Sequence, residues 1–288
     1  MLPTEFRLLQ LIRKPPGHLE IDFPVPPAEG AFNLFKVAIK IFFSNWIPIG
    51  KIVFLFILPY SLLFHSYIYL LKDSIVDPHK WIRTPYELIL WGLPQGILMA
   101  VVIPSVIYCL IGCLRNGHPP PLRESLRWGL YRAPRFWVWN MIAFIIVAVG
   151  LFLFIVPGII LAVRYIFVGA VISVEASGGQ SVFKRSKEIS SGHGWTIFSA
   201  MILCWGLFML ITAPFIAIEH YPLGGLYGIL TLILNGIEAE KIVFLTFLVY
   251  TIVTPLVSLI SQFWVVLILL LYLSLVSAHN SLRIAKIP

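Results

Sequence analysis

The sequence predicts an all-α membrane protein with six transmembrane helices and three amphipathic helices that lie along the cytoplasmic interface. Hydrophobic residues make up 59% of the 288 residues and charged residues 12%, which is about half of the charged share of a soluble domain. Apolar runs recur along the chain, and several reach the length of about 20 residues that a helix needs to cross a bilayer. Basic residues gather between alternate runs, as they do on the cytoplasmic side of membrane proteins.

The chain divides into an arm, a membrane domain and a tail. Residues 1–28 are rich in proline and charge, and such segments are extended rather than packed. Residues 29–280 form the predicted six-span domain, and residues 281–288 form a short tail. The arm lacks the apolar core of a secretory signal peptide, so we expect the first span to act as the insertion signal. Two roles stay open for the arm: a free cytoplasmic segment, or a strap that docks on a partner.

The first third of the membrane domain is predicted to contain one interfacial helix and two spans. Residues 29–44 place phenylalanines at helical spacing beside Lys36 and Lys40, a pattern typical of a helix in the headgroup plane. The first span covers residues 46–71 and the second residues 88–113. Prolines inside both runs predict kinks.

A second basic amphipathic segment at residues 115–135 precedes the third and fourth spans, residues 137–156 and 158–176. Pro157 and Gly158 alone separate these spans, so the sequence predicts a tight turn and a hinge there. The arginines of residues 115–135 agree with an ordinary cytoplasmic loop, and binding of lipid phosphates is the alternative.

A break at Gly178-Gly179 leads to a third basic helix at residues 180–192 and a fifth span at residues 195–218. The last run, residues 242–278, contains 37 residues without charge. At about 1.5 Å per residue this run is roughly 55 Å long, well beyond a hydrocarbon core of about 30 Å. We therefore expect either a strong tilt or a break, and we favour a bend at Pro255.

The distribution of basic residues predicts that both ends of the chain are cytoplasmic. With the N-terminus inside, fifteen Lys and Arg lie in cytoplasmic segments and four on the far side. The same rule accounts for the net charge of +8, so the sequence gives no reason to expect nucleic acid as a partner.

Four charged residues are the candidates for a lipid-binding site or for structural ion pairs. Arg164 and Glu175 lie eleven residues apart in the fourth span, about 16 Å along a continuous helix, so they cannot pair with each other. Glu175 is expected to pair with Lys184 or Arg185 beyond the glycine break. Ionisable groups inside spans often serve function, but for Arg164 and Glu175 we favour structural pairing.

The residues give no support for catalysis, a metal or a cofactor. The chain contains no metalloprotease motif, nucleophile elbow or phosphate-binding loop. Cys109 and Cys113 share one helix face, but a zinc site needs more ligands than this pair. We therefore expect a protein that is not an enzyme and holds no metal or cofactor.

The central stretch carries a recognisable order of residues: Pro157-Gly158, Arg164-Tyr165, Glu175, Ser181, Arg185-Ser186, Gly192 and Trp195. This order resembles that of a prokaryotic six-span family, similar to the membrane domain attached to some glycerophosphodiester phosphodiesterases and to its stand-alone relatives. The resemblance implies a six-span fold and, with it, the prokaryotic inner membrane. In the fused enzymes the hydrolase is a separate soluble barrel, so the resemblance does not imply that activity here.

The leading functional hypothesis is a non-catalytic accessory or scaffold subunit of a larger membrane complex, contacting other subunits through the N-terminal arm. The alternative is a transporter or chaperone of a lipid or small amphiphile, with Arg164 beside an anionic headgroup. Membrane lipids are expected partners in both cases.

Overall fold

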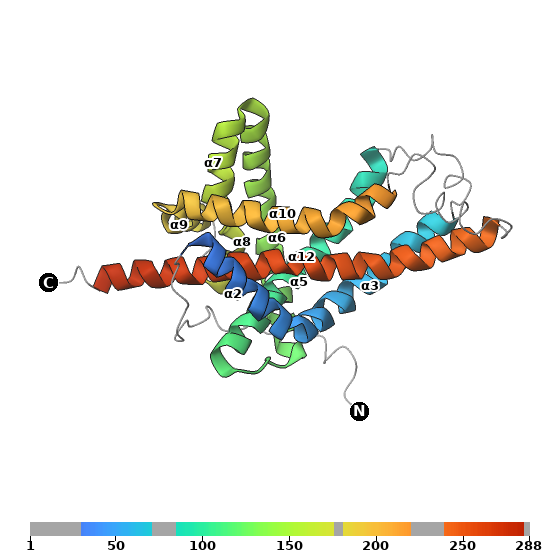
Figure 1. The fold of residues 1–288 in the computed structure, drawn as a ribbon, viewed down its shortest axis with the longest axis horizontal. Coiled ribbons are helices and arrows are strands. Elements are labelled where there is room, and N and C mark those ends of the chain that lie inside the picture. Colours follow the sequence, from blue (N-terminus) through green and yellow to red (C-terminus); the bar gives the residue numbers. More distant parts are fainter. Residues whose placement is uncertain (1–29, 71–84, 176–180, 220–238, 285–288) are drawn as a thin grey trace. The chain divides into compact units, whose positions relative to one another are not determined.

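The computed structural model describes residues 30–70, 85–175, 181–219 and 239–284, and these ranges are almost entirely helical, without any strand (Figure 1). The N-terminal arm, the Gly178-Gly179 break and the far-side loop at residues 220–238 lie outside the described residues. The helices follow in chain order: α2 (Ala31–Ser44), α3 (Trp46–Leu70), α5 (Pro85–Asn116), α6 (Leu122–Leu153), α7 (Ile155–Tyr165), α8 (Val168–Val174), α9 (Ser181–Ser190), α10 (Gly194–Glu219) and α12 (Ala239–Ile284).

Six segments of the described chain are long and apolar enough to cross a membrane. Four lie in α3, α5, α10 and α12, one lies in α6, and the sixth covers residues Ile155–Val174, which include α7 and α8. The predicted all-α, six-span membrane protein is confirmed. The predicted first and fifth spans agree with α3 and α10 to within a residue at each end.

The turn between the third and fourth spans lies at Phe154, before the predicted hinge at Pro157 and Gly158. Phe154 adopts an extended conformation, with φ −153° and ψ 127°, and separates α6 from α7. Pro157 then lies in the first turn of α7, where a missing N–H leaves no hydrogen bond unmade.

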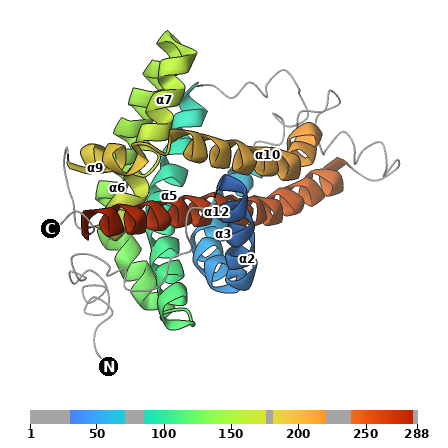
Figure 2. The same ribbon diagram turned by 60° about the vertical axis from the view of Figure 1, so that its left-hand side comes forward.

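Gly158 has a packing role in this hairpin rather than a turn role. A Cβ atom at this position would lie 2.5 Å from the backbone nitrogen of Leu151 on α6. The absent side chain therefore allows α6 and α7 to pack backbone against backbone. The two helices lie side by side in each view (Figures 1 and 2).

One predicted boundary is absent because the helix continues through it. The basic segment around residues 122–135 and the third span form one helix, α6, with Pro134 inside it. The last apolar run lies in a single helix, α12, and Pro255 lies inside it rather than at a break.

The chain forms two compact units. Unit 1 contains residues 1–52, 99–204 and 262–288, and unit 2 contains residues 53–98 and 205–261. In unit 2, the Ser61 hydroxyl donates to the carbonyl of Thr251 at 3.1 Å, and the His65 ring stacks on Tyr250. These contacts join α3 to α12 within that unit.

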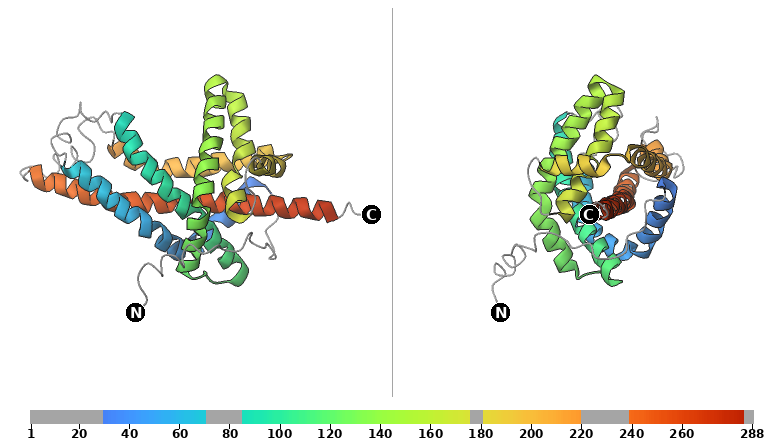
Figure 3. Two further views of the ribbon diagram at one scale, coloured as in Figure 1. Left: turned by 180° about the vertical axis from the view of Figure 1, so that it is seen from behind. Right: turned by 90° about the vertical axis from the view of Figure 1, so that its left-hand side faces the viewer.

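The core of unit 1 is built around the second half of α12. Residues 265–276 of this helix are buried, as are all seven residues of α8 except Gly169. The amphipathic helix α2 packs on the same half of α12, because Phe35 and Phe42 both meet the Phe263 ring edge-on at 5.4 and 5.9 Å. Two further views show α8 and α9 following the α6–α7 hairpin in this unit (Figure 3).

Candidate functional site

Unit 1 contains two groups of polar side chains. Those of the first group bond to one another and to the backbone, and the second group includes exposed cations. We call the first the anchor cluster, made of Trp128, Arg132, Glu175, Arg185 and Tyr272. The second lines a pocket between α7, α9 and the start of α10, which we call the α7–α10 pocket.

The anchor cluster begins with two side chains of α6 that meet the C-terminal end of α8. The indole of Trp128 donates to the carbonyl of Ser173 at 2.8 Å, and Nη1 of Arg132 donates to the carbonyl of Glu175 at 2.9 Å. The last carbonyls of a helix have no partner within the helix itself. The guanidinium of Arg132 also lies 4.7 Å from the Trp128 ring centroid, in a cation–π arrangement. Both residues are 1% exposed, so α6 covers the end of α8 in the protein interior.

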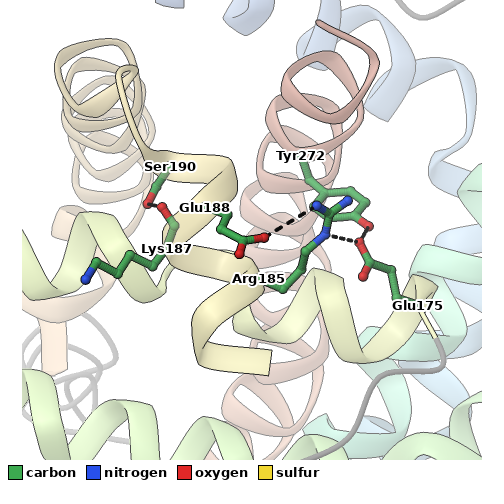
Figure 4. A network of polar contacts seen from close by, with 6 residues as sticks. All are labelled: Glu175, Arg185, Lys187, Glu188, Ser190 and Tyr272. Atoms are coloured by element: carbon green, nitrogen blue, oxygen red, sulfur yellow. Dashed lines mark hydrogen bonds and ion pairs between the residues drawn. The ribbon is translucent and has the colours of Figure 1, made fainter. Parts of the chain in front are cut away.

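The carboxylate of Glu175 completes the cluster (Figure 4). Its Oε1 atom accepts from Nε of Arg185 at 3.0 Å and from the hydroxyl of Tyr272 at 2.7 Å. Arg185 also lies 3.8 Å from Glu188, one turn further along α9. Glu175 therefore joins the end of α8 to α9 and to the middle of the buried half of α12. Of the two pairings that the sequence left open for Glu175, the structure contains the one with Arg185.

The α7–α10 pocket has a volume of about 410 Å³. Its apolar wall comes from α7 and from the first turns of α10, and consists of Ile159, Ile160, Val163, Trp195 and Phe198. Trp195 is 79% exposed, and its ring lies 5.6 Å from that of Phe198. The wall therefore presents a large aromatic surface to whatever fills the pocket.

Among the described residues, the polar part of the pocket carries positive charge and no carboxylate. Arg164 of α7 and Lys187 of α9 both line it, and both side chains are exposed. Within the described part of the chain, neither side chain makes an ion pair or a hydrogen bond. In Figure 4, Lys187 extends away from the anchor cluster although it lies only two residues after Arg185.

Two serine hydroxyls of α9 bond to backbone carbonyls at this pocket. The hydroxyl of Ser186 is buried and donates to the carbonyl of Arg164 at 2.8 Å, which fixes α9 against the end of α7. Ser190 donates to the carbonyl of Lys187 at 3.1 Å, so its hydroxyl proton is already engaged. The chain then turns at Gly192, whose φ of +81° favours glycine, and enters α10.

The predicted site residues thus separate into different places. Arg164 lies in the pocket, whereas Glu175 and Arg185 lie in the anchor cluster. Lys184 is exposed on α9 and does not line the pocket. Gly178 and Gly179 lie outside the described residues.

Lys187, Arg132 and Tyr272 are among the residues of these two sites that were absent from the predicted set. Lys187 could have been found from helical spacing, since it lies three residues from Lys184 on a short basic helix. Arg132 could have been found from its position four residues after Trp128, one helical turn away. Tyr272 lies 97 residues from Glu175 in an uncharged run, and nothing local connects the two.

No group of three or more potential metal ligands occurs in the part of the chain that the structure describes. Comparison of the chain with family models, with curated proteins and with solved structures gave no match.

Proposed function

We propose that this integral membrane protein binds an anionic amphiphile, a lipid with a negatively charged headgroup, and catalyses no reaction on it. The α7–α10 pocket is the observation that carries the proposal. It combines two exposed cations, Arg164 and Lys187, with an aromatic and aliphatic wall and no carboxylate.

The charge of the pocket favours an anion as the bound group. A cation placed near Arg164 and Lys187 would meet repulsion from both, whereas an anion would be attracted by both. Arginine inside a span is costly unless it faces protein, water or an anionic partner, so its exposure to a pocket calls for such a partner. Arg164 lies within the apolar segment Ile155–Val174.

The apolar wall favours an amphiphile over a simple ion. A volume of about 410 Å³ accommodates a headgroup, whereas the acyl chains of a membrane lipid would extend beyond it along the apolar surface. Trp195 and Phe198 would contact the region between headgroup and chains, where aromatic side chains of membrane proteins prefer to lie. This arrangement supports a transporter or chaperone of a lipid or small amphiphile.

The accessory-subunit hypothesis remains a prediction. It depends on the arm at residues 1–28, which lies outside the described residues. The resemblance to the membrane domain of glycerophosphodiester phosphodiesterases also remains a prediction. From the distribution of Lys and Arg we further propose that both chain ends lie on the cytoplasmic side. The prokaryotic inner membrane is what the family resemblance implies.

Charge reversal at Arg164 tests the proposal. The full chain is purified gently from its own membrane as wild type, Arg164→Glu and Lys184→Glu, and native mass spectrometry identifies the lipids that remain bound. Lys184 is the matched control because it is an exposed cation on α9 outside the pocket. We expect wild type and Lys184→Glu to retain an anionic lipid and Arg164→Glu to lose it, with equal melting temperatures of the three proteins after the lipid has been removed in detergent. Equal lipid retention in all three folded proteins would overturn the proposal.

A further inference from the structure

We infer that the α7–α10 pocket recognises a phosphomonoester group. This inference rests on the proposed function and specifies the chemistry of its ligand. The group could be the headgroup of a phosphatidic acid or part of a soluble phosphate ester, and the experiment below separates these two sources.

The number of cations that line the pocket favours a dianion over a monoanion. A phosphomonoester carries a charge of about −1.5 to −2 at neutral pH, whereas a phosphodiester carries a single negative charge. Arg164 and Lys187 supply two positive charges from two different helices to one pocket without a carboxylate. A second negative charge on the ligand therefore gains attraction from the second cation without meeting repulsion from the lining.

The two cations also differ in a way that suits phosphate. A guanidinium presents a planar pair of donors that matches two phosphate oxygens, and an ammonium acts as a compact charge that can face the third. A terminal phosphate has three such oxygens, whereas a phosphodiester leaves two unesterified. Both side chains are exposed and have no side-chain partner among the described residues, so they are available for these contacts.

The backbone beside the cations adds to the positive potential. Gly194 lines the pocket and begins α10, a helix of 26 residues. The first hydrogen bond of this helix joins the N–H of Ile197 to the carbonyl of His193 at 3.0 Å, and the N–H groups before it have no acceptor within the helix. A Cβ atom at Gly194 would approach Val163 no closer than 4.0 Å, so the backbone at Gly194 is not tightly packed against α7. The helix end supports the two cations and is not itself the basis of the inference.

The test compares how strongly the full-length protein retains two lipids that have identical acyl chains. The protein is placed in nanodiscs of zwitterionic lipid that contain either phosphatidic acid or phosphatidylglycerol, and bound lipid is counted by native mass spectrometry after release. We expect retention of phosphatidic acid to exceed that of phosphatidylglycerol roughly fivefold to tenfold, as one additional charge-assisted contact would give.

Substitutions in the pocket should remove this preference. We expect Arg164→Gln to lower retention of phosphatidic acid about tenfold or more, and Lys187→Gln to lower it about fivefold. Lys184→Gln, an equal loss of charge on α9 outside the pocket, should leave both the retention and the preference unchanged. Arg164→Lys should retain part of the binding, because it keeps the charge but not the planar pair of donors.

The outcomes separate the inference from the proposed function. Equal retention of both lipids, lost in Arg164→Gln, would overturn the phosphomonoester and leave an anionic-lipid site. Retention of both lipids that does not respond to Arg164→Gln would overturn both claims. Competition by glycerol 3-phosphate at concentrations comparable to those of the lipid would support the phosphomonoester and assign it to a soluble ester, against the amphiphile. Failure of glycerol 3-phosphate to compete would assign it to the lipid.

Discussion

Arg132 and Arg164 lie in the same compact unit, and their environments differ in every respect. Arg132 is 1% exposed, stacks on Trp128 and donates to the carbonyl of Glu175. Arg164 is exposed in a pocket and has no side-chain partner within the described residues. Burial of a cation is costly unless the protein supplies partners, and Nη1 of Arg132 has one in the carbonyl of Glu175. The first arginine therefore stabilises the fold, and the second is available to a ligand.

The largest expected effect comes from breaking the anchor cluster at Arg132. Arg132→Met removes the donor to the carbonyl of Glu175 and the contact with Trp128, and leaves the end of α8 without one partner. We expect a loss of about 2–4 kcal/mol in the free energy of unfolding, seen as a lower melting temperature in detergent. Arg135→Met on the same helix is the control, because Arg135 is exposed, and should change the free energy by less than about 0.5 kcal/mol. Equal stability of the two variants would contradict the structural role of Arg132.

A second prediction concerns the close contact between α6 and α7. Arg164 lies on α7. Gly158→Ala would place a methyl group 2.5 Å from the backbone of Leu151, and backbone cannot move aside cheaply. We expect a loss of about 1–3 kcal/mol in the free energy of unfolding, measured as a lower melting temperature. Gly206→Ala on α10 meets nothing within 4 Å and should be neutral or slightly stabilising. A hairpin that tolerates Gly158→Ala without loss would show that the two backbones are further apart than described.

The six spans could be predicted from the sequence because the hydropathy of a segment depends only on the residues in that segment. The ends of α3 and α10 follow from where apolar runs begin and end. The turn at Phe154 did not follow, because Pro157 and Gly158 are typical turn residues whose actual roles are a first helical turn and a close helix contact. Composition alone does not distinguish these roles.

The candidate site was predictable only in part. Glu175 and Arg185 are ten residues apart, so short-range charge pairing was enough to suggest their contact. Tyr272 reaches Glu175 through the tertiary fold from 97 residues away. Arg164 was recognised as unusual inside a span, but its pocket is formed by side chains from α7, α9 and α10, whose arrangement the sequence does not specify.

A third, smaller effect is expected at Tyr272 in the anchor cluster. Tyr272→Phe removes one hydrogen bond to the Glu175 carboxylate and leaves the pair with Arg185 in place. We expect a loss of about 1–2 kcal/mol in stability. A double-mutant cycle of Tyr272→Phe and Glu175→Gln, followed by thermal unfolding, should give a coupling energy of at least about 0.5 kcal/mol. Additive effects would mean that the two groups do not interact.

The smallest effect on stability is expected in the pocket. Arg164→Gln and Lys187→Gln remove exposed side chains that form no hydrogen bond or ion pair among the described residues. Each should change the free energy of unfolding by less than about 0.5 kcal/mol in lipid-free detergent. A loss as large as that of Arg132→Met would show that Arg164 is part of the structural framework, and the contrast between the two arginines would fail.

The most direct test measures the melting temperature of wild type, Tyr272→Phe and Arg164→Gln while a short-chain anionic phospholipid is added. A ligand that binds the folded state raises the melting temperature with its concentration. We predict that Tyr272→Phe starts below wild type and rises in parallel with it, and that Arg164→Gln starts at the wild-type value and does not rise. A rise in Arg164→Gln equal to that of wild type would contradict the claim that this arginine is held for a ligand.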